Sequence, residues 1–171
     1  MAKGKRVFFE DEVEALKLDG ITEVSMLKQS CSGLPKSAGV YVVLGNYPEM
    51  PEFLEKGTGP EFHNKKGTRQ PMNYSVSDLE RKWVDNTWIV YIGKTDNTLY
   101  KRISDYIKFG KGQDVAHRGG RAIWQLPDSE KLLIGWKIIE PPITAEQIEK
   151  EWLRVFKNNH NDNLPFANWR E

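Results

Sequence analysis

The sequence predicts a mixed α/β domain in which helices pack against one small sheet. Three short runs rich in β-branched and aromatic residues, at 39–44, 88–95 and 131–139, are typical of strands. Amphipathic segments that fit helices follow the second and third runs, at 98–109 and at about 144–157. At 171 residues the chain is long enough for one domain with a core of its own, and too short to promise two.

Two shorter elements are expected before the first strand. The stretch FFEDEVEALKLDG predicts a short helix that ends at Gly20, and ITEVSMLKQ predicts a second element. Pro35 and Gly39 then bracket the approach to the run GVYVVL. We therefore expect residues 1–33 to form an extension packed on or beside the core, and residues 34–171 to form the domain itself.

A long excursion separates the first two strands. Residues 45 to about 87 are rich in Gly, Pro, Asn and Lys, as loops are, and within them only SVSDLERKWVDN fits a helix. A loop-rich segment of this size inside a small domain is usually functional or mobile. We expect it to be a large insertion between the two strands.

The last predicted helix carries an acid on its apolar side. Thr144, with Gln147 three residues on, forms a capping-box pattern at its start. At about 100° per residue, Glu149 falls inside the apolar arc of this helix. A carboxylate that faces an apolar surface is costly unless it is paired. Glu149 therefore caps the helix edge or pairs with a lysine, or it serves metal binding or catalysis.

The composition is that of an ordinary globular protein. The formal net charge of +1 gives no global attraction to nucleic acid or to a membrane. Residues 94–121 hold seven bases and three acids, so this region could bind a polyanion or could be a chance cluster on a solvated surface.

Cys31 is the only cysteine, which excludes an internal disulfide and a cysteine-rich zinc site. No stretch resembles a signal peptide or a membrane span, so a cytoplasmic protein is expected.

The tripeptide Gly93-Lys94-Thr95 matches the end of a phosphate-binding P-loop, but the rest of that motif is missing. A P-loop needs another glycine five residues before Gly93, so that backbone N–H groups can wrap the phosphates. Trp88 stands at that position, and the residues between are those of a buried strand. The P-loop interpretation is therefore rejected.

The helix predicted at 98–109 places an arginine beside a tyrosine. Arg102 and Tyr106, four residues apart, share one flank of its apolar stripe. Such an arginine can grip a phosphate bidentately, or it can form a structural salt bridge.

These residues occur together in the order of a known family. The chain resembles the GIY-YIG nuclease superfamily in Gly39-Val40-Tyr41, in Tyr91-Ile92-Gly93-Lys94, in Leu99 with Arg102-Ile103, in the helical Glu149, and in Pro165 and Asn168. The resemblance covers roughly residues 34–171, and YIGKTDNTLYKRI is its most specific part.

The resemblance implies a small three-stranded sheet flanked by helices, with a short hairpin where this chain has its excursion. It implies an endonuclease that hydrolyses DNA phosphodiesters with one divalent metal, Mg²⁺ or Mn²⁺, which suits a single carboxylate with several waters. By the same resemblance, Tyr41 would be the general base, Tyr91 would position water or phosphate, and Lys94 would supply positive charge. Arg102 would stabilise the transition state, Glu149 would bind the metal, and Asn168 would brace the site.

Some positions stay open. Tyr106 and His117 each match a variant of the family's auxiliary catalytic position, and Glu151 is a second candidate metal ligand. DNA contacts are expected at Lys65, Lys66 and Arg69 in the excursion, and at Arg118 and Arg121 beside Gly119-Gly120, where the alternatives are a solvated loop and a simple chain turn.

The sequence thus predicts a metal-dependent DNA endonuclease. The prediction requires four residues distant in the chain, Tyr41, Tyr91, Arg102 and Glu149, to converge on one water-accessible pocket. The alternative is a catalytically silent module that binds nucleic acid or protein on a nuclease-like fold. The full residue set favours the enzyme.

Overall fold

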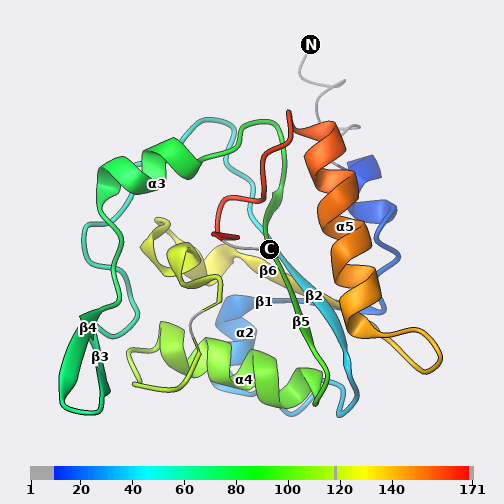
Figure 1. Cartoon of the computed structure of the whole chain (residues 1–171), viewed down its shortest axis with the longest axis horizontal. Helices are drawn as coiled ribbons and strands as arrows, with labels where there is room; N and C mark the ends of the chain where they lie inside the picture. Colours follow the sequence, from blue (N-terminus) through cyan, green and yellow to red (C-terminus); the bar gives the residue numbers. More distant parts are fainter. Residues whose placement is uncertain (1–9, 118, 170–171) are drawn as a thin grey trace.

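The computed structural model describes residues 10–117 and 119–169, with Lys65 by its backbone only (Figure 1). A four-stranded antiparallel sheet forms its centre, in the order β1-β6-β2-β5. The two inner strands, β6 and β2, pair along their whole length. The strands are β1 (Gly20–Glu23), β2 (Gly39–Leu44), β5 (Ile89–Thr95) and β6 (Leu133–Ile138).

The mixed α/β architecture is confirmed, but the sheet has four strands rather than the three expected. The additional strand, β1, pairs with β6 and places Gly20 opposite Trp136. A Cβ at Gly20 would lie 2.3 Å from the Trp136 ring, so only a glycine lets β1 lie beside this tryptophan. Gly20 therefore begins a strand instead of ending a helix, and the helical residues before it are 10–14. Four strand residues followed directly by α2 (Val24–Gln29) are too few to show a strand pattern in the sequence.

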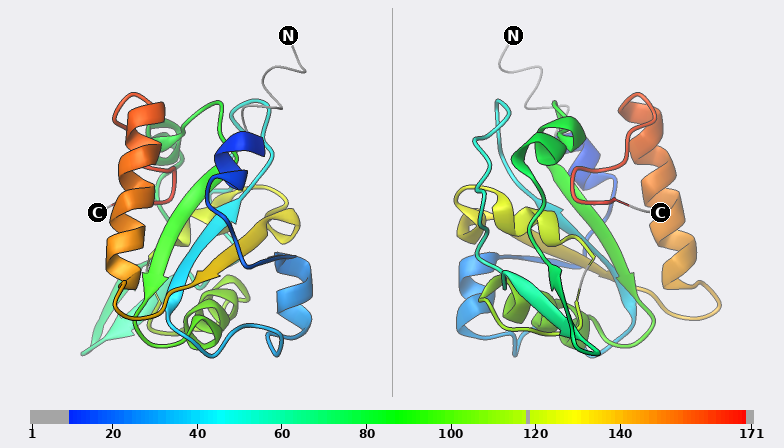
Figure 2. Two further views of the ribbon diagram at one scale, coloured as in Figure 1. Left: turned by 90° about the vertical axis from the view of Figure 1, so that its right-hand side faces the viewer. Right: turned by 60° about the vertical axis from the view of Figure 1, so that its left-hand side comes forward.

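Helices cover both faces of the sheet (Figures 1 and 2). Because side chains alternate along a strand, β2 points Tyr41 into one core and Val42 into the other. Helix α4 (Leu99–Gly110) packs in the first core and α5 (Ala145–Asn159) in the second. All six residues of β2 are buried, which explains its unbroken apolar sequence.

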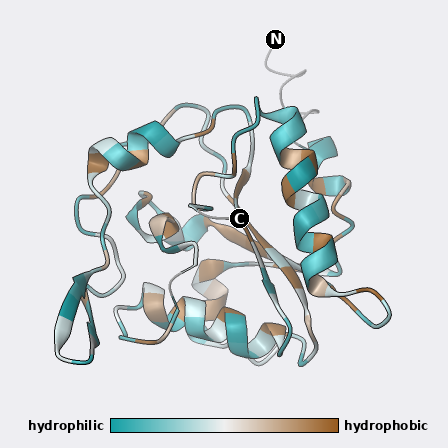
Figure 3. Ribbon diagram, viewed as in Figure 1, coloured by the Kyte–Doolittle hydropathy of each residue, from teal (hydrophilic) through white to brown (hydrophobic). Residues whose placement is uncertain are grey.

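The α5 helix begins as the sequence predicts. Gln147 N donates to Thr144 Oγ1, and Thr144 N donates to the Gln147 side chain, which completes the capping box. Figure 3 shows hydrophobic residues along the strands and many hydrophilic residues on the helices. None of the helices in the described ranges is long and apolar enough to cross a membrane.

The segment between β2 and β5 leaves the sheet and returns to it, although these two strands are neighbours. It forms a separate two-stranded hairpin and a short helix, which lie on the side of the molecule away from α5 (Figure 1). The buried Gln125 fastens it, because its Nε2 donates to Leu54 O (3.0 Å) and to Tyr74 O (2.9 Å). The remaining elements are β3 (Phe62–Lys65), β4 (Thr68–Pro71), α3 (Val76–Lys82) and the 3-10 helices η1 (Arg121–Gln125) and η2 (Ser129–Lys131).

Candidate active site

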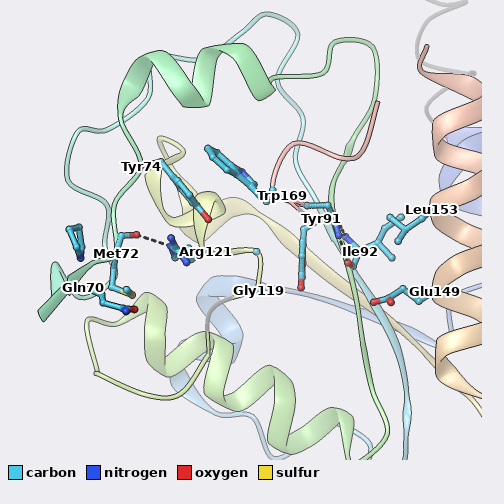
Figure 4. A pocket seen from close by; sticks show the side chains of 14 residues that line it. Gln70, Met72, Tyr74, Tyr91, Ile92, Gly119, Arg121, Glu149, Leu153 and Trp169 are labelled. Carbon is cyan, nitrogen blue, oxygen red and sulfur yellow. Dashed lines mark hydrogen bonds between the residues drawn. The ribbon is translucent and has the colours of Figure 1, made fainter. Parts of the chain in front are cut away.

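A cavity of about 720 Å³ lies beside β5, one of the two edge strands of the sheet (Figure 4). Tyr91 and Ile92 of β5 line it, together with Glu149 of α5 and Asn168 near the end of the chain. The Tyr91 hydroxyl and the Glu149 carboxylate both point toward its interior (Figure 4). Three distant parts of the sequence thus share one hollow.

Asn168 fixes the C-terminal segment to the edge of the sheet. Its Oδ1 accepts a hydrogen bond from Ile92 N (2.9 Å), and its Nδ2 donates to Ile92 O (2.8 Å). Beside it, Ala167 N donates to Val90 O (2.8 Å). These bonds satisfy backbone groups that an edge strand would otherwise leave open. They also hold the wall of the cavity in place, the bracing position expected for Asn168.

Three tyrosine rings pack together next to the cavity. The ring centroids of Tyr41 and Tyr91 are 5.8 Å apart, and the Tyr106 centroid lies 6.2 Å from the first and 5.8 Å from the second. Tyr41 and Tyr106 are fully buried, whereas Tyr91 lines the cavity. Gly93 stands opposite Tyr41 in the sheet, where a Cβ would lie 2.7 Å from Tyr41 Cζ. The glycine of the YIG sequence therefore makes room for the Tyr41 ring.

Burial favours the protonated form of these phenols. Burial raises the pKa of Tyr41, and it raises the pKa of Tyr91 well above its usual range, with the neighbouring Tyr41 hydroxyl adding to the second shift. The Arg102 guanidinium opposes both shifts, because a positive charge favours the phenolate. The Tyr41 hydroxyl lies close to both groups, without a hydrogen bond of good geometry to any described residue.

The two candidates for the auxiliary position, Tyr106 and His117, both support the turn at Gly119-Gly120. The Tyr106 hydroxyl donates to Gly120 O (2.5 Å), and His117 Nε2 lies 2.9 Å from Gly119 O, which makes this nitrogen the donor. The two rings also stack, with centroids 4.5 Å apart. Both side chains are fully buried, and neither lines the cavity.

The turn lies directly against Tyr91 and Arg102. A Cβ at Gly119 would be 2.7 Å from Tyr91 Oη and 3.4 Å from Arg102 Nη2. Gly120 has a φ of 72°, a left-handed conformation that favours glycine. Arg102 itself is not among the residues that line the cavity.

Glu149 lies between two hollows. It lines the first cavity and also a second hollow of about 580 Å³, which Lys94 lines as well. Burial raises the pKa of Glu149, and the charges of Lys94 and Arg102 work in the opposite direction. Glu151 lines neither hollow: its exposed carboxylate accepts hydrogen bonds from Arg154 Nε (3.0 Å) and Nη2 (2.6 Å).

The acidic groups suit a hard, hydrated cation better than a cage of protein ligands. Within the described ranges, no three His, Cys, Asp or Glu side chains come together as a metal site. Glu149 is the single acid among the described residues that line the larger cavity. Mg²⁺ keeps several waters and needs only one or two carboxylates, so this donor set fits it.

The family model for the GIY-YIG catalytic domain matches residues 71–162, which is more than half of the chain. The chain belongs to the GIY-YIG family. Members of this family are generally endonucleases, so the domain implies a nuclease-type function and a nucleic-acid substrate. No similar curated protein and no similar solved structure was found.

The matched part of the GIY-YIG domain contains Tyr91, Arg102 and Glu149, but neither β2 nor the C-terminal segment. Tertiary contacts bring β2 and the C-terminal segment to the matched part of the domain. Tyr41 is brought in by the pairing of β2 with β5, and Asn168 by its hydrogen bonds to the β5 backbone.

Across the cavity from Glu149, the GIY-YIG domain has a stack of flat side chains, in which Arg121, one of the expected DNA contacts, joins two aromatic residues that the sequence did not mark (Figure 4). The rings of Tyr74 and Trp169 stack with centroids 3.7 Å apart, and the Arg121 guanidinium lies 4.4 Å from the Tyr74 ring. Arg121 Nε also donates to Met72 O (3.1 Å). Tyr74 and Trp169 lie in segments without helical or strand periodicity, so no sequence pattern marks them.

The other candidate DNA contacts lie away from the cavity or outside the described chain. Lys66 and Arg69 are exposed on the β3–β4 hairpin, and Lys65 belongs to β3. Arg118 lies outside the described residues.

Proposed function

We propose that this protein is a metal-dependent DNA endonuclease that hydrolyses a phosphodiester bond in the cavity beside β5. One observation carries the proposal: a phenol, Tyr91, and a carboxylate, Glu149, open onto the same hollow of about 720 Å³. A hollow of this size is typical of ligand sites and leaves room for a phosphodiester with its water.

Glu149 would hold one divalent cation, Mg²⁺ or Mn²⁺. Burial disfavours the charged form of this carboxyl group, as its raised pKa indicates, and a cation beside it would offset that cost. When bound, the ion would act as a Lewis acid on a phosphoryl oxygen and add positive charge beside the phenols.

Tyr91 would orient the attacking water and, in the fraction of molecules in which it is a phenolate, accept the proton of that water, because it is the tyrosine of the cluster that lines the cavity. The family resemblance predicts the base at Tyr41, which is fully buried and would instead support Tyr91 from behind. A phenol with a pKa above about 10 is almost entirely protonated at neutral pH. The proton transfer therefore depends on nearby positive charge, part of which Arg102 supplies.

Two further cations would act on the DNA backbone. Arg102, close behind the Gly119 turn, would stabilise the negative charge that builds on the phosphate during attack. Lys94, in the second hollow beside Glu149, would contact the backbone on the other side of the cleavage point. Its ammonium group is held by Asp96 (2.8 Å).

The test is cleavage of supercoiled plasmid with Mg²⁺ or Mn²⁺, comparing two glutamates of α5. Glu149→Gln keeps the shape of the side chain but removes its charge, and it should cut about a thousandfold more slowly, since metal stabilisation is worth several kcal/mol. Glu151→Gln is the matched control, because Glu151, whose carboxylate pairs with Arg154, lines neither hollow, and it should cut within about twofold of wild type. EDTA should abolish cleavage. Equal rates for Glu149→Gln and wild type, or cleavage unaffected by EDTA, would contradict the proposal.

A DNA-binding module that does not cut is the second candidate. One observation favours it: Arg102 does not line the cavity, although it lies close to the Gly119 turn. A wild-type protein that binds labelled DNA but leaves plasmid intact with either metal would decide for the module.

A further inference from the structure

We propose that the β3–β4 hairpin enters the major groove of duplex DNA and reads base pairs next to the cleavage point, through Asn64 and Arg69 on its outer face. The inference rests on the proposed function and deepens it. It assigns duplex rather than single-stranded DNA as the substrate, and it names the residues that select the sequence.

The hairpin is not part of the domain core. Its two strands form a sheet of their own, and all four residues of β4 are exposed. The strands are joined through Lys66 and Gly67, whose φ values of 47° and 80° produce the tight turn that suits a two-residue hairpin. A lone two-stranded hairpin is marginally stable in water. A partner surface that packs on the hairpin would therefore add to its stability.

One face of the hairpin is turned toward the rest of the protein. His63 contacts Asp114 in the segment after α4, and Gln70, directly opposite His63, lines the cavity. Because side chains alternate across a strand, Asn64 and Arg69 occupy the other face, where they are also directly opposite each other. Both are exposed.

The side chains on this outer face are of the types that read bases. In the major groove, Asn can bond bidentately to adenine and Arg to guanine, and the groove is wide enough to admit a two-stranded ribbon. The Arg69 guanidinium lies 4.1 Å from the Phe62 ring, which restricts its conformations before binding. The sequence of residues 62–71 contains three lysine or arginine residues and no acid, so the hairpin carries no charge that repels DNA.

The base of the hairpin is held at the cavity. Pro71 and Met72 line it, Met72 is buried, and its carbonyl accepts the hydrogen bond from Arg121. The strand from Gln70 to the hairpin turn is four residues long, which is about 13 Å of extended chain. With base pairs spaced about 3.4 Å apart, the hairpin would read positions within about four base pairs of the bond cut at the cavity. A single strand has no groove and would not engage this face.

The experiment selects bound sequences from a random library of duplexes of about 24 base pairs, without divalent metal, using the whole chain. Wild type should enrich a short motif about ten- to a hundredfold, as expected for one or two bidentate base contacts. The double variant Asn64→Ala/Arg69→Ala should lose that enrichment while its urea midpoint stays unchanged. The control Arg81→Ala removes an arginine of α3 that is 76% exposed and paired with Asp78, and it should keep the motif.

Three outcomes of the binding selection would overturn the inference: no motif from duplexes, the same motif from the double variant, or stronger selection from a single-stranded library. Because binding is read without cleavage, this result is separate from the nuclease assay. A protein that enriches a motif through the hairpin but never cuts would leave this inference standing and refute the nuclease. With Mg²⁺ added, cuts should fall within about four base pairs of the motif, and cuts placed at random to it would also overturn the inference.

Discussion

Wild type should lose stability on mild acidification, and replacing His117 by glutamine should make that loss much smaller. His117 is fully buried, stacks on Tyr106 and donates from Nε2 to Gly119 O. Burial lowers the pKa of His117 from 6.5 to about 3, and the Arg102 charge contributes in the same direction. The imidazole is therefore neutral in the folded protein at every mildly acidic pH.

The sign follows from where the proton binds. As the pH falls through 6.5, the unfolded chain takes up a proton at His117 that the folded protein does not accept until about pH 3. Protonation thus favours unfolding, and the stability present above pH 6.5 is lost steadily toward pH 3. From these pKa values, linkage gives a loss of about 2 kcal/mol between about pH 7 and about pH 5 from this one residue.

Urea unfolding of wild type and His117→Gln at the two pH values measures this loss directly. Both proteins contain the same other titrating groups, so the difference between their pH dependences isolates His117. The control is Tyr106→Phe, which removes the other hydrogen bond to the Gly119-Gly120 turn and should lower stability equally at both pH values. If His117→Gln loses as much stability on acidification as wild type does, the buried, neutral imidazole is refuted.

Two further substitutions test the walls of the cavity. Asn168→Ala removes both bonds to the backbone of Ile92 and should cost about 1–3 kcal/mol in urea unfolding. Asn168→Asp should cost at least as much, because it places a buried carboxylate oxygen against Ile92 O. An alanine variant as stable as wild type would contradict the bracing role. Gly119→Ala places a methyl group 2.7 Å from Tyr91 Oη and should slow plasmid cleavage at least about tenfold. Gly33→Ala, which meets no atom within 4 Å, is its control, and equal rates for the two variants would count against a close role of the turn.

Local sequence determined most of the regular structure. The run at β2 is continuous because all of its residues are buried, and α5 starts at a capping box formed by residues three apart. Each of these signals lies within a few adjacent residues, so it can be read without knowing the rest of the fold. The spacing between the YIG sequence and Arg102 likewise predicted the family, which the family model confirmed. The sequence did not predict strand β1, because it is short and its pairing partner, β6, lies more than a hundred residues later in the chain.

Only tertiary structure decided which side chains meet at the cavity. Tyr91 packs in the core on one face of the sheet, and α5 packs in the core on the opposite face. The two side chains share the cavity because β5 is an edge strand, so that Glu149 of α5 can approach Tyr91 around that edge. The same packing placed Tyr41 behind Tyr91, although the motif alone marks both tyrosines equally. On the opposite wall, Tyr74 is held by a hydrogen bond from Gln125, fifty-one residues away in the chain, to its backbone carbonyl. Such contacts depend on how the whole chain buries its apolar surface, and no short stretch of sequence encodes that sum.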